Sequence, residues 1–324
     1  MPTMASVPGK RRRTEVAEPM ATAAHAGTAT GEGLRPTLAE LIALRGSVQR
    51  RGIDGRGRHG LTGPAPSQLR GRGMEYAESR EYVAGDDARH IDWRLTARSG
   101  RAHTKLFQAE RERLSLIVAD TAPALYFGTR LRFKSVQAAR AAAVAAWLAQ
   151  RQGDRVAALR GSQREAPIPP AGGPRGVLRV LDALVRWYAE PPADDAGLAV
   201  ALDHAARLLR PGSRLTVFAD PRSAAALPAA RWSGLAQHHE VVLVLLVDPL
   251  ELSPPPKRLP FLAGDQRVEL DLAGTPTRER WETAFVASLR RLCEELPARR
   301  VSVRVLAADA ASDDWLLPGR GSVP

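Results

Sequence analysis

The stretch LSLIVAD, residues 114–120, decides the fold because it is a continuous apolar run that ends on an aspartate. Such a run is typical of a strand that is buried on both faces of a sheet. Two similar runs follow, SRLTVFAD at 213–220 and EVVLVLLVD at 240–248. Because parallel strands are the ones that read as unbroken apolar runs, we expect a mostly parallel sheet.

Helical patterns separate these apolar runs along the chain. Further strands are predicted at 154–161 and 300–308, and a hairpin at 258–272. Strands that alternate with helices indicate an α/β fold, with a doubly wound sheet and helices on both faces. The predicted helices have apolar residues on one face and span 134–152, 176–190, 197–210, 225–237 and 278–296.

Asp120 and Asp220 each follow a predicted strand directly. Ligands of doubly wound sheets bind at the carboxyl ends of the strands, so both aspartates are candidate site residues. A pair of carboxylates there could contribute to a Mg²⁺ site, which needs further oxygen ligands. Alternatively, Asp120 accepts backbone N–H groups of the following turn, and we favour this interpretation because only Thr121 supplies a hydroxyl nearby.

The composition of the 324 residues is that of a globular protein, with one cysteine and no run of about 18 apolar residues. The single Cys293 excludes an internal disulfide framework and a zinc site built from cysteines. The basic residues at 10–13 precede no apolar segment, so they do not form a secretory signal. We expect a cytoplasmic protein that does not insert into a membrane.

The net charge of +12 comes mostly from arginines that are spread along the chain. A GC-rich genome explains this composition, and we favour that explanation over a dedicated nucleic-acid module, whose basic residues cluster among aromatics. The alternative is a nucleic-acid-binding protein that uses the arginine-rich region 45–101. Within it, the glycine-rich segment 52–73 is either a connector or an anion-binding loop.

Four regions are expected along the chain. Residues 1–33 lack periodicity and are predicted to be a disordered basic tail. Residues 34–112 hold a short amphipathic helix at 36–51, the glycine-rich segment and a charged segment. The α/β domain is predicted at 113–310, and a C-terminal tail at 311–324.

The charged segment ESREYVAGDDARHIDWRLTARSG, residues 78–100, places Gly85, Asp86 and Asp87 in a turn pattern. Asp86 or Asp87 is expected to cap a short helix that follows. The segment's acidic and basic side chains are expected to form one ionic lattice, and this lattice with Trp93 is a candidate docking surface. The predicted lattice consists of Arg80, Asp87, Arg89, Asp92, Arg94 and Arg98.

Catalytic motifs are not found in the sequence. His90 has no serine or cysteine nucleophile motif near it, and no G-x-S-x-G or phosphate-binding glycine pattern occurs. A hydrolase that uses Asp86 or Asp87 is the least favoured interpretation, because no set of nucleophile, base and oxyanion donors accompanies them. We therefore expect a protein that is not an enzyme.

The charged segment resembles the signature of the bacterial family called domain of unknown function 58. Residues 71–75 resemble the lead-in of that signature through Gly71, Gly73 and Glu75. The similarity covers residues 34–310. The matching signature positions are Arg80, Tyr82, Gly85, Asp86, Asp87, Arg89, Ile91, Asp92, Trp93, Ala97, Arg98, Lys105, Phe107 and Glu110.

This resemblance implies a von Willebrand factor A-like domain that follows a family-specific segment. It also implies a role as a scaffold, together with a MoxR-type AAA+ ATPase and other von Willebrand A proteins, in chaperone-like maturation of protein complexes. The implied metal motif is degenerate here. Asp120 and Asp220 match its aspartates, but Ala122 and Ala124 stand at its serine positions, and residues 167–176 contain no threonine. We therefore expect no cofactor.

Overall fold

The computed structural model describes residues 33–50, 74–109, 113–263 and 266–317. Most of the predicted tail, the glycine-rich segment 52–73 and the signature positions Gly71, Gly73 and Glu110 lie outside the described residues.

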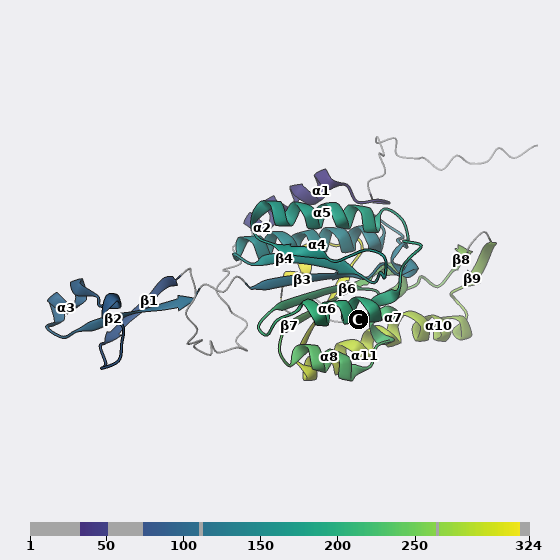
Figure 1. Cartoon of the computed structure of the whole chain (residues 1–324). Coiled ribbons are helices and arrows are strands. Elements are labelled where there is room, and N and C mark those ends of the chain that lie inside the picture. Colours follow the sequence, from purple (N-terminus) through teal and green to yellow (C-terminus); the bar gives the residue numbers. More distant parts are fainter. Residues whose placement is uncertain (1–32, 51–73, 110–112, 264–265, 318–324) are drawn as a thin grey trace, which may run out of the picture. The chain divides into compact units, whose positions relative to one another are not determined.

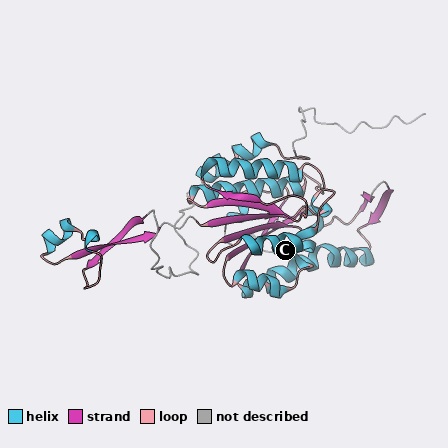
Figure 2. Cartoon of the chain, in the orientation of Figure 1, coloured by secondary structure: helices cyan, strands magenta, loops and turns pink. Residues whose placement is uncertain are grey.

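A six-stranded sheet forms the centre of the described α/β body (Figures 1 and 2). Five of its strands are parallel, and β5 at one edge is antiparallel to its neighbour β4. The predicted α/β class with a mostly parallel sheet is confirmed. In spatial order the strands are β10 (Val301–Ala307), β7 (Glu240–Val247), β6 (Arg214–Ala219), β3 (Leu114–Ala119), β4 (Arg155–Arg160) and β5 (Ile168–Ala171).

Helices cover both faces of this sheet, as the apolar runs predicted. Alternate residues of β3 show why the whole run is apolar. Ile117 lies in the core on one face, and Leu116 and Val118 lie in the core on the other. The first face is covered by α4 (Lys134–Arg151) and α5 (Gly173–Tyr188); the second is covered by α6 (Gly197–Leu208), α8 (Ala229–Ala236) and α11 (Ala287–Glu295).

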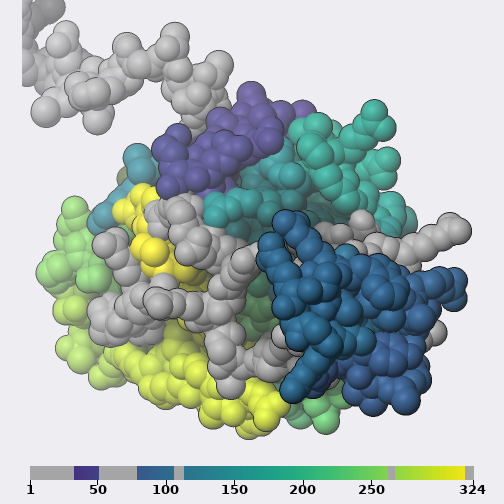
Figure 3. Space-filling view, turned by 90° about the vertical axis from the view of Figure 1, so that its left-hand side faces the viewer, coloured from purple at the N-terminus to yellow at the C-terminus, as the bar shows by residue number. Residues whose placement is uncertain are grey.

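The helix predicted at 36–51 is two short helices, α1 (Leu38–Ala43) and α2 (Arg45–Arg50), which are separated at Leu44. They pack on α4 and α5, and Figure 3 shows their purple surface beside the teal surface of α5. Trp147 of α4 donates its indole N–H to the carbonyl oxygen of Leu41 at 3.0 Å. The bond ties the start of the described chain to the main core.

Strand β5 was not predicted, because Pro169 and Pro170 lie in its middle. Proline cannot donate a ladder hydrogen bond, so it is confined to strands at the edge of a sheet. Ala158 and Val156 of β4 pair with Ile168 and Ala171, which flank the two prolines, and a register irregularity lies between them. The edge position therefore makes the strand possible.

The predicted C-terminal helix is interrupted by a π-helical turn, Glu282–Val286, between α10 (Thr275–Trp281) and α11. The predicted hairpin is confirmed as β8 (Arg258–Ala263) and β9 (Gln266–Asp271), which pair antiparallel. Trp281 packs on Phe285 and on Phe261 of the hairpin, with ring centroids 4.6 and 5.6 Å apart.

The charged segment forms an antiparallel ribbon of β1 (Met74–Glu81) and β2 (His103–Ala109). A short 3₁₀ helix, η1 (Ala88–His90), and the α-helix α3 (Trp93–Ser99) lie between the two strands along the chain. We call residues 74–109 the signature module. The sequence predicted a single short helix here and missed both strands.

Candidate functional site

The carboxyl ends of β3 and β6 lie where the sheet topology reverses. From β3 the chain continues to β4 on one side, and it later enters β6 on the other side of β3. Asp120 and Asp220 follow these two neighbouring parallel strands, and the Asp120 N–H donates to the carbonyl oxygen of Phe218 at 2.9 Å. This is the position at which doubly wound sheets bind ligands.

Asp120 is buried, and both of its carboxylate oxygens accept backbone hydrogen bonds. Oδ1 accepts the N–H of Ala122 at 3.1 Å, and Oδ2 accepts the N–H of Asp220 at 3.0 Å. Burial raises the pKa of Asp120 to about 6, although a hydrogen bond from Ser223 and the two backbone N–H groups oppose the shift. The prediction that Asp120 serves as an acceptor in the following turn is confirmed.

Asp220 caps the short helix α7 (Pro221–Ala225) and pairs with a buried lysine. Its Oδ1 accepts the Arg222 N–H at 2.9 Å, and its Oδ2 lies 2.8 Å from Nζ of Lys134. The same Nζ lies 2.6 Å from Oε1 of Glu251. The Lys134 side chain has no exposed surface, and those of Asp220 and Glu251 are 2% and 6% exposed. We call these three residues the buried triad.

The two carboxylates of the buried triad differ in their electrostatic balance. Burial raises the pKa of Asp220, but the attraction and hydrogen bond of Lys134, together with the N–H group and charge of Arg222, outweigh burial and hold that pKa below the ordinary value. Burial raises the pKa of Glu251, and Lys134 only partly offsets it. One ammonium group therefore serves two carboxylates, and Asp220 is the more acidic partner.

The residues at these strand ends do not fit a Mg²⁺ site. In the described part of the chain, no three His, Cys, Asp or Glu side chains are grouped so that they could hold a metal ion. The oxygens of Asp120 already accept N–H groups, and Lys134 occupies Oδ2 of Asp220. The Thr121 hydroxyl donates to Asp195 at 2.9 Å. A divalent cation needs about six oxygen ligands and would have to displace an ammonium group here.

Three residues at this edge of the sheet were not predicted as site residues: Lys134, Glu251 and a third strand-end aspartate, Asp248. The carboxylate of Asp248 accepts the hydroxyl of Thr129 at 2.6 Å and its N–H at 2.9 Å. The available signal for Lys134 was its place in the first turn of α4, where the helix dipole disfavours a cation unless a carboxylate is near.

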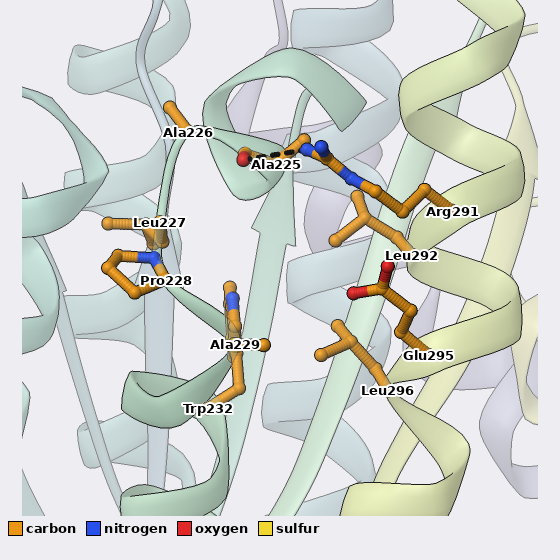
Figure 4. Close-up of a pocket in the computed structure, with 10 residues that line it drawn as sticks. All are labelled: Ala225, Ala226, Leu227, Pro228, Ala229, Trp232, Arg291, Leu292, Glu295 and Leu296. Carbon is orange, nitrogen blue, oxygen red and sulfur yellow. Dashed lines mark hydrogen bonds between the residues drawn. The ribbon is translucent and has the colours of Figure 1, made fainter.

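A hollow of about 330 Å³ lies between α11 and the chain from α7 to α8 (Figure 4). Arg291 donates to the carbonyl oxygen of Ala225 at 3.0 Å across it. Arg291 and Glu295 are the charged side chains that line it, and its other lining residues are apolar. The hollow therefore offers no nucleophile and base pair for catalysis.

In the signature module, Gly85 and Asp86 form the predicted turn. Gly85 has a φ of 109°, which favours glycine, and the carboxylate of Asp86 accepts the Val83 N–H at 3.0 Å. Arg80 pairs with Asp86 at 2.7 Å, and the Tyr82 hydroxyl donates to the carbonyl oxygen of Asp86 at 3.3 Å. These contacts make Arg80, Tyr82 and Asp86 parts of one turn.

The prediction of a single ionic lattice is wrong, because the aspartates act mainly as local caps. Asp87 caps η1 and pairs with Arg89 at 3.3 Å. Asp92 caps α3 through the Leu95 N–H at 3.1 Å and accepts the Ser79 hydroxyl at 3.2 Å. Short polar side chains commonly bond to nearby backbone groups in this way. Arg98 is exposed, and no ion pair joins it to the described side chains.

Trp93 is the most exposed of the large apolar side chains that the structure describes, at 70% of its surface. It is the first residue of α3 and follows the capping Asp92. His90 is half-buried at the end of η1. The turn and cap residues of the signature hold the module together, whereas Arg89, Trp93, Ala97 and Arg98 are exposed.

No helix in the described residues has both the length and the apolar character needed to cross a membrane. No solved structure matches the chain. Uncharacterized proteins of Mycobacterium bovis (Mb1516) and Mycobacterium tuberculosis (Rv1480) are each 31% identical to it over 190 residues, which is 57% of this chain. The match spans 58% of the length of these relatives.

A family-level comparison gives the wider relationship. The family described as "Protein of unknown function DUF58" matches residues 78–291, which include most of the signature module and five of the six strands of the central sheet. The match covers more than half of the 324 residues. The chain therefore belongs to the DUF58 family.

Proposed function

We propose that this protein is a non-enzymatic interaction protein whose signature module docks onto a partner through Trp93. The observation that carries the proposal is the 70% exposure of Trp93 at the start of α3, where the capping bond is made by Asp92. Tryptophan is enriched among the residues that dominate binding energy at protein interfaces. A helix that presents an exposed aromatic side chain is a suitable anchor.

The state of the strand ends supports a binding role over catalysis. Asp120 and Asp220, the candidates for chemistry at the usual ligand position, are engaged by backbone N–H groups and by Lys134. A catalytic site requires a nucleophile or base that can reach a substrate. These buried carboxylates already have internal partners, so the sheet serves as a scaffold.

We also propose that the sheet is a von Willebrand factor A-like domain and that the partner is a MoxR-type AAA+ ATPase. When the strands are numbered within the sheet alone, their order is 3-2-1-4-5-6, the doubly wound order. Asp120 follows strand 1 of this numbering, which is β3, and its position supports the proposed relationship. The partner assignment rests on the family resemblance, and it places the protein in chaperone-like maturation of other complexes.

The experiment is co-purification of the tagged full-length protein from its own cells, with and without ATP, followed by mass spectrometry. Recovery of a MoxR-type ATPase is expected, and Trp93→Ala or Arg98→Ala should reduce it without lowering the thermal unfolding midpoint. Arg179→Ala, an exposed arginine on α5, is the matched control and should leave recovery unchanged. Loss of folding in Trp93→Ala would make Trp93 a structural residue and would remove the docking proposal.

Nucleic-acid binding is the alternative, since the arginine-rich region lies partly in the signature module. Such binding weakens steeply as salt rises, because phosphate contacts release counterions. Binding of a duplex or single strand at low salt, lost at higher salt and insensitive to Trp93→Ala, would favour this alternative.

A further inference from the structure

We infer that the outer face of α3 binds an acidic protein segment that carries an apolar residue among its carboxylates. The inference rests on the proposed docking role of the signature module and names the kind of partner surface. We call Trp93, Arg94, Ala97 and Arg98 the outer face of α3. All four side chains are exposed.

The inner side of α3 is fixed by bonds to the ribbon. The Thr96 hydroxyl oxygen accepts the His103 N–H at 3.0 Å, and the Ser99 hydroxyl bonds to the carbonyl oxygen of Arg101 at 3.1 Å. Leu95 and Thr96 are half-buried. Residues at the opposite helical positions therefore point away from the ribbon.

The outer face has an apolar row and a basic row. Trp93 and Ala97 are four residues apart, so they lie one above the other on the helix, as do Arg94 and Arg98. The small side chain of Ala97 leaves the indole ring accessible from that side. Arg94 and Arg98 occupy the neighbouring helical positions, and each guanidinium group is a planar fork of donors that matches a carboxylate.

Among residues 79–105, three of the four acidic residues are paired with arginines that lie outside this face. Glu81 pairs with Arg101, and Asp86 and Asp87 pair with Arg80 and Arg89. The remaining acid of residues 79–105 is the capping residue of α3. No ion pair joins Arg94 or Arg98 to any side chain that the structure describes.

The module favours a short acidic protein segment over a nucleic acid. A polyanion is bound by many cations along a groove, with several aromatic rings for stacking. Here three of the arginines are paired with carboxylates of the same module, and the outer face holds one aromatic ring and two cations. Two carboxylates near one apolar side chain would satisfy this face.

The test uses the full-length protein and a fluorescent peptide that has one phenylalanine flanked by glutamates. The peptide is expected to bind to the wild type. Fluorescence anisotropy should show an affinity about tenfold lower for Arg94→Glu/Arg98→Glu and for Trp93→Ala, which corresponds to about 1.4 kcal/mol of binding free energy. Arg175→Glu/Arg179→Glu on α5 is the matched charge control and should bind normally. Replacing the peptide's glutamates by glutamines should also weaken binding.

Three outcomes would overturn the inference: no binding of the acidic peptide, equal binding of the glutamine peptide, or displacement of the peptide by a single-stranded oligonucleotide that binds more tightly.

Co-purification separates this inference from the proposed function. If Trp93→Ala abolishes partner recovery but Arg94→Glu/Arg98→Glu does not, the docking role stands and the acidic partner is wrong. If neither variant affects recovery, both proposals fail.

Discussion

Replacing Lys134 by methionine tests the buried triad, because methionine has a similar length and no charge. The change removes the ammonium group that lies 2.8 Å from Asp220 and 2.6 Å from Glu251. It leaves two carboxylates that are almost fully buried without their cation. The shape of the core is nearly conserved, so the effect reports charge and hydrogen bonding more than packing.

The expected cost is about 3–5 kcal/mol, the typical loss when one partner of a buried ion pair is removed. A domain is stabilised by only about 5–15 kcal/mol in total, so the variant should be severely weakened. For a body of this size the thermal midpoint should fall on the order of 10 °C. The remaining carboxylates will bind protons more readily, so the deficit relative to wild type should shrink as the pH is lowered towards 4.

Urea unfolding monitored by circular dichroism measures this loss as a shift of the midpoint at an unchanged slope. The control is Lys134→Met combined with Asp220→Asn and Glu251→Gln, which removes every charge and keeps an acceptor oxygen at each acidic position. Replacing a whole buried charge group is far less costly than breaking it, so the triple variant should recover most of the stability. A loss below about 1 kcal/mol, or a triple variant no more stable than the single one, would refute this account of Lys134.

Two further predictions concern the same edge of the sheet. The folded pKa of Asp120 is about 6 and the ordinary value is 3.8, so its ionisation should weaken the wild type by roughly 3 kcal/mol as pH rises from about 3 to about 7. Asp120→Asn should flatten this part of the stability profile, and an unchanged profile would contradict the shift. Gly161→Ala should lower the free energy of unfolding by about 1–3 kcal/mol, as measured by urea unfolding, because the new Cβ would collide with the backbone of Gly197. Gly172→Ala, whose Cβ meets open space, is the control. Equal urea midpoints for the two variants would refute the collision.

The central sheet could be predicted from sequence because its strands are buried on both faces and read as apolar runs. The strands that were missed lack this signal. The two prolines of β5 are not expected within a strand, so this edge strand was not predicted. Strands β1 and β2 form a two-stranded ribbon whose sequence is largely polar. The sequence of this ribbon shows no clear apolar period, so its pairing could not be inferred from periodicity.

The candidate site was predictable only in part. The closeness of Asp120 and Asp220 followed from parallel strand ends, and the 3.0 Å bond between the Asp120 carboxylate and the Asp220 N–H confirms it. Lys134 lies 86 residues from Asp220 and 117 from Glu251 along the chain, so only tertiary packing brings the triad together. The lattice prediction failed because local backbone N–H groups compete successfully for Asp87 and Asp92.

The two parts of the family match both satisfy their polar groups internally, but the signature module leaves a large aromatic side chain exposed, and this contrast directs the search for function. At the strand ends, Asp120 and Asp220 are buried and satisfied by backbone N–H groups and by Lys134, so a ligand there would have to break internal bonds. In the signature module, the caps and turns are equally satisfied, yet Trp93 stays exposed. Among the described residues of the module, no hydrogen bond uses the indole ring of Trp93. The docking role proposed above accounts for this exposure, and in that proposal the sheet is the body that carries the docking helix.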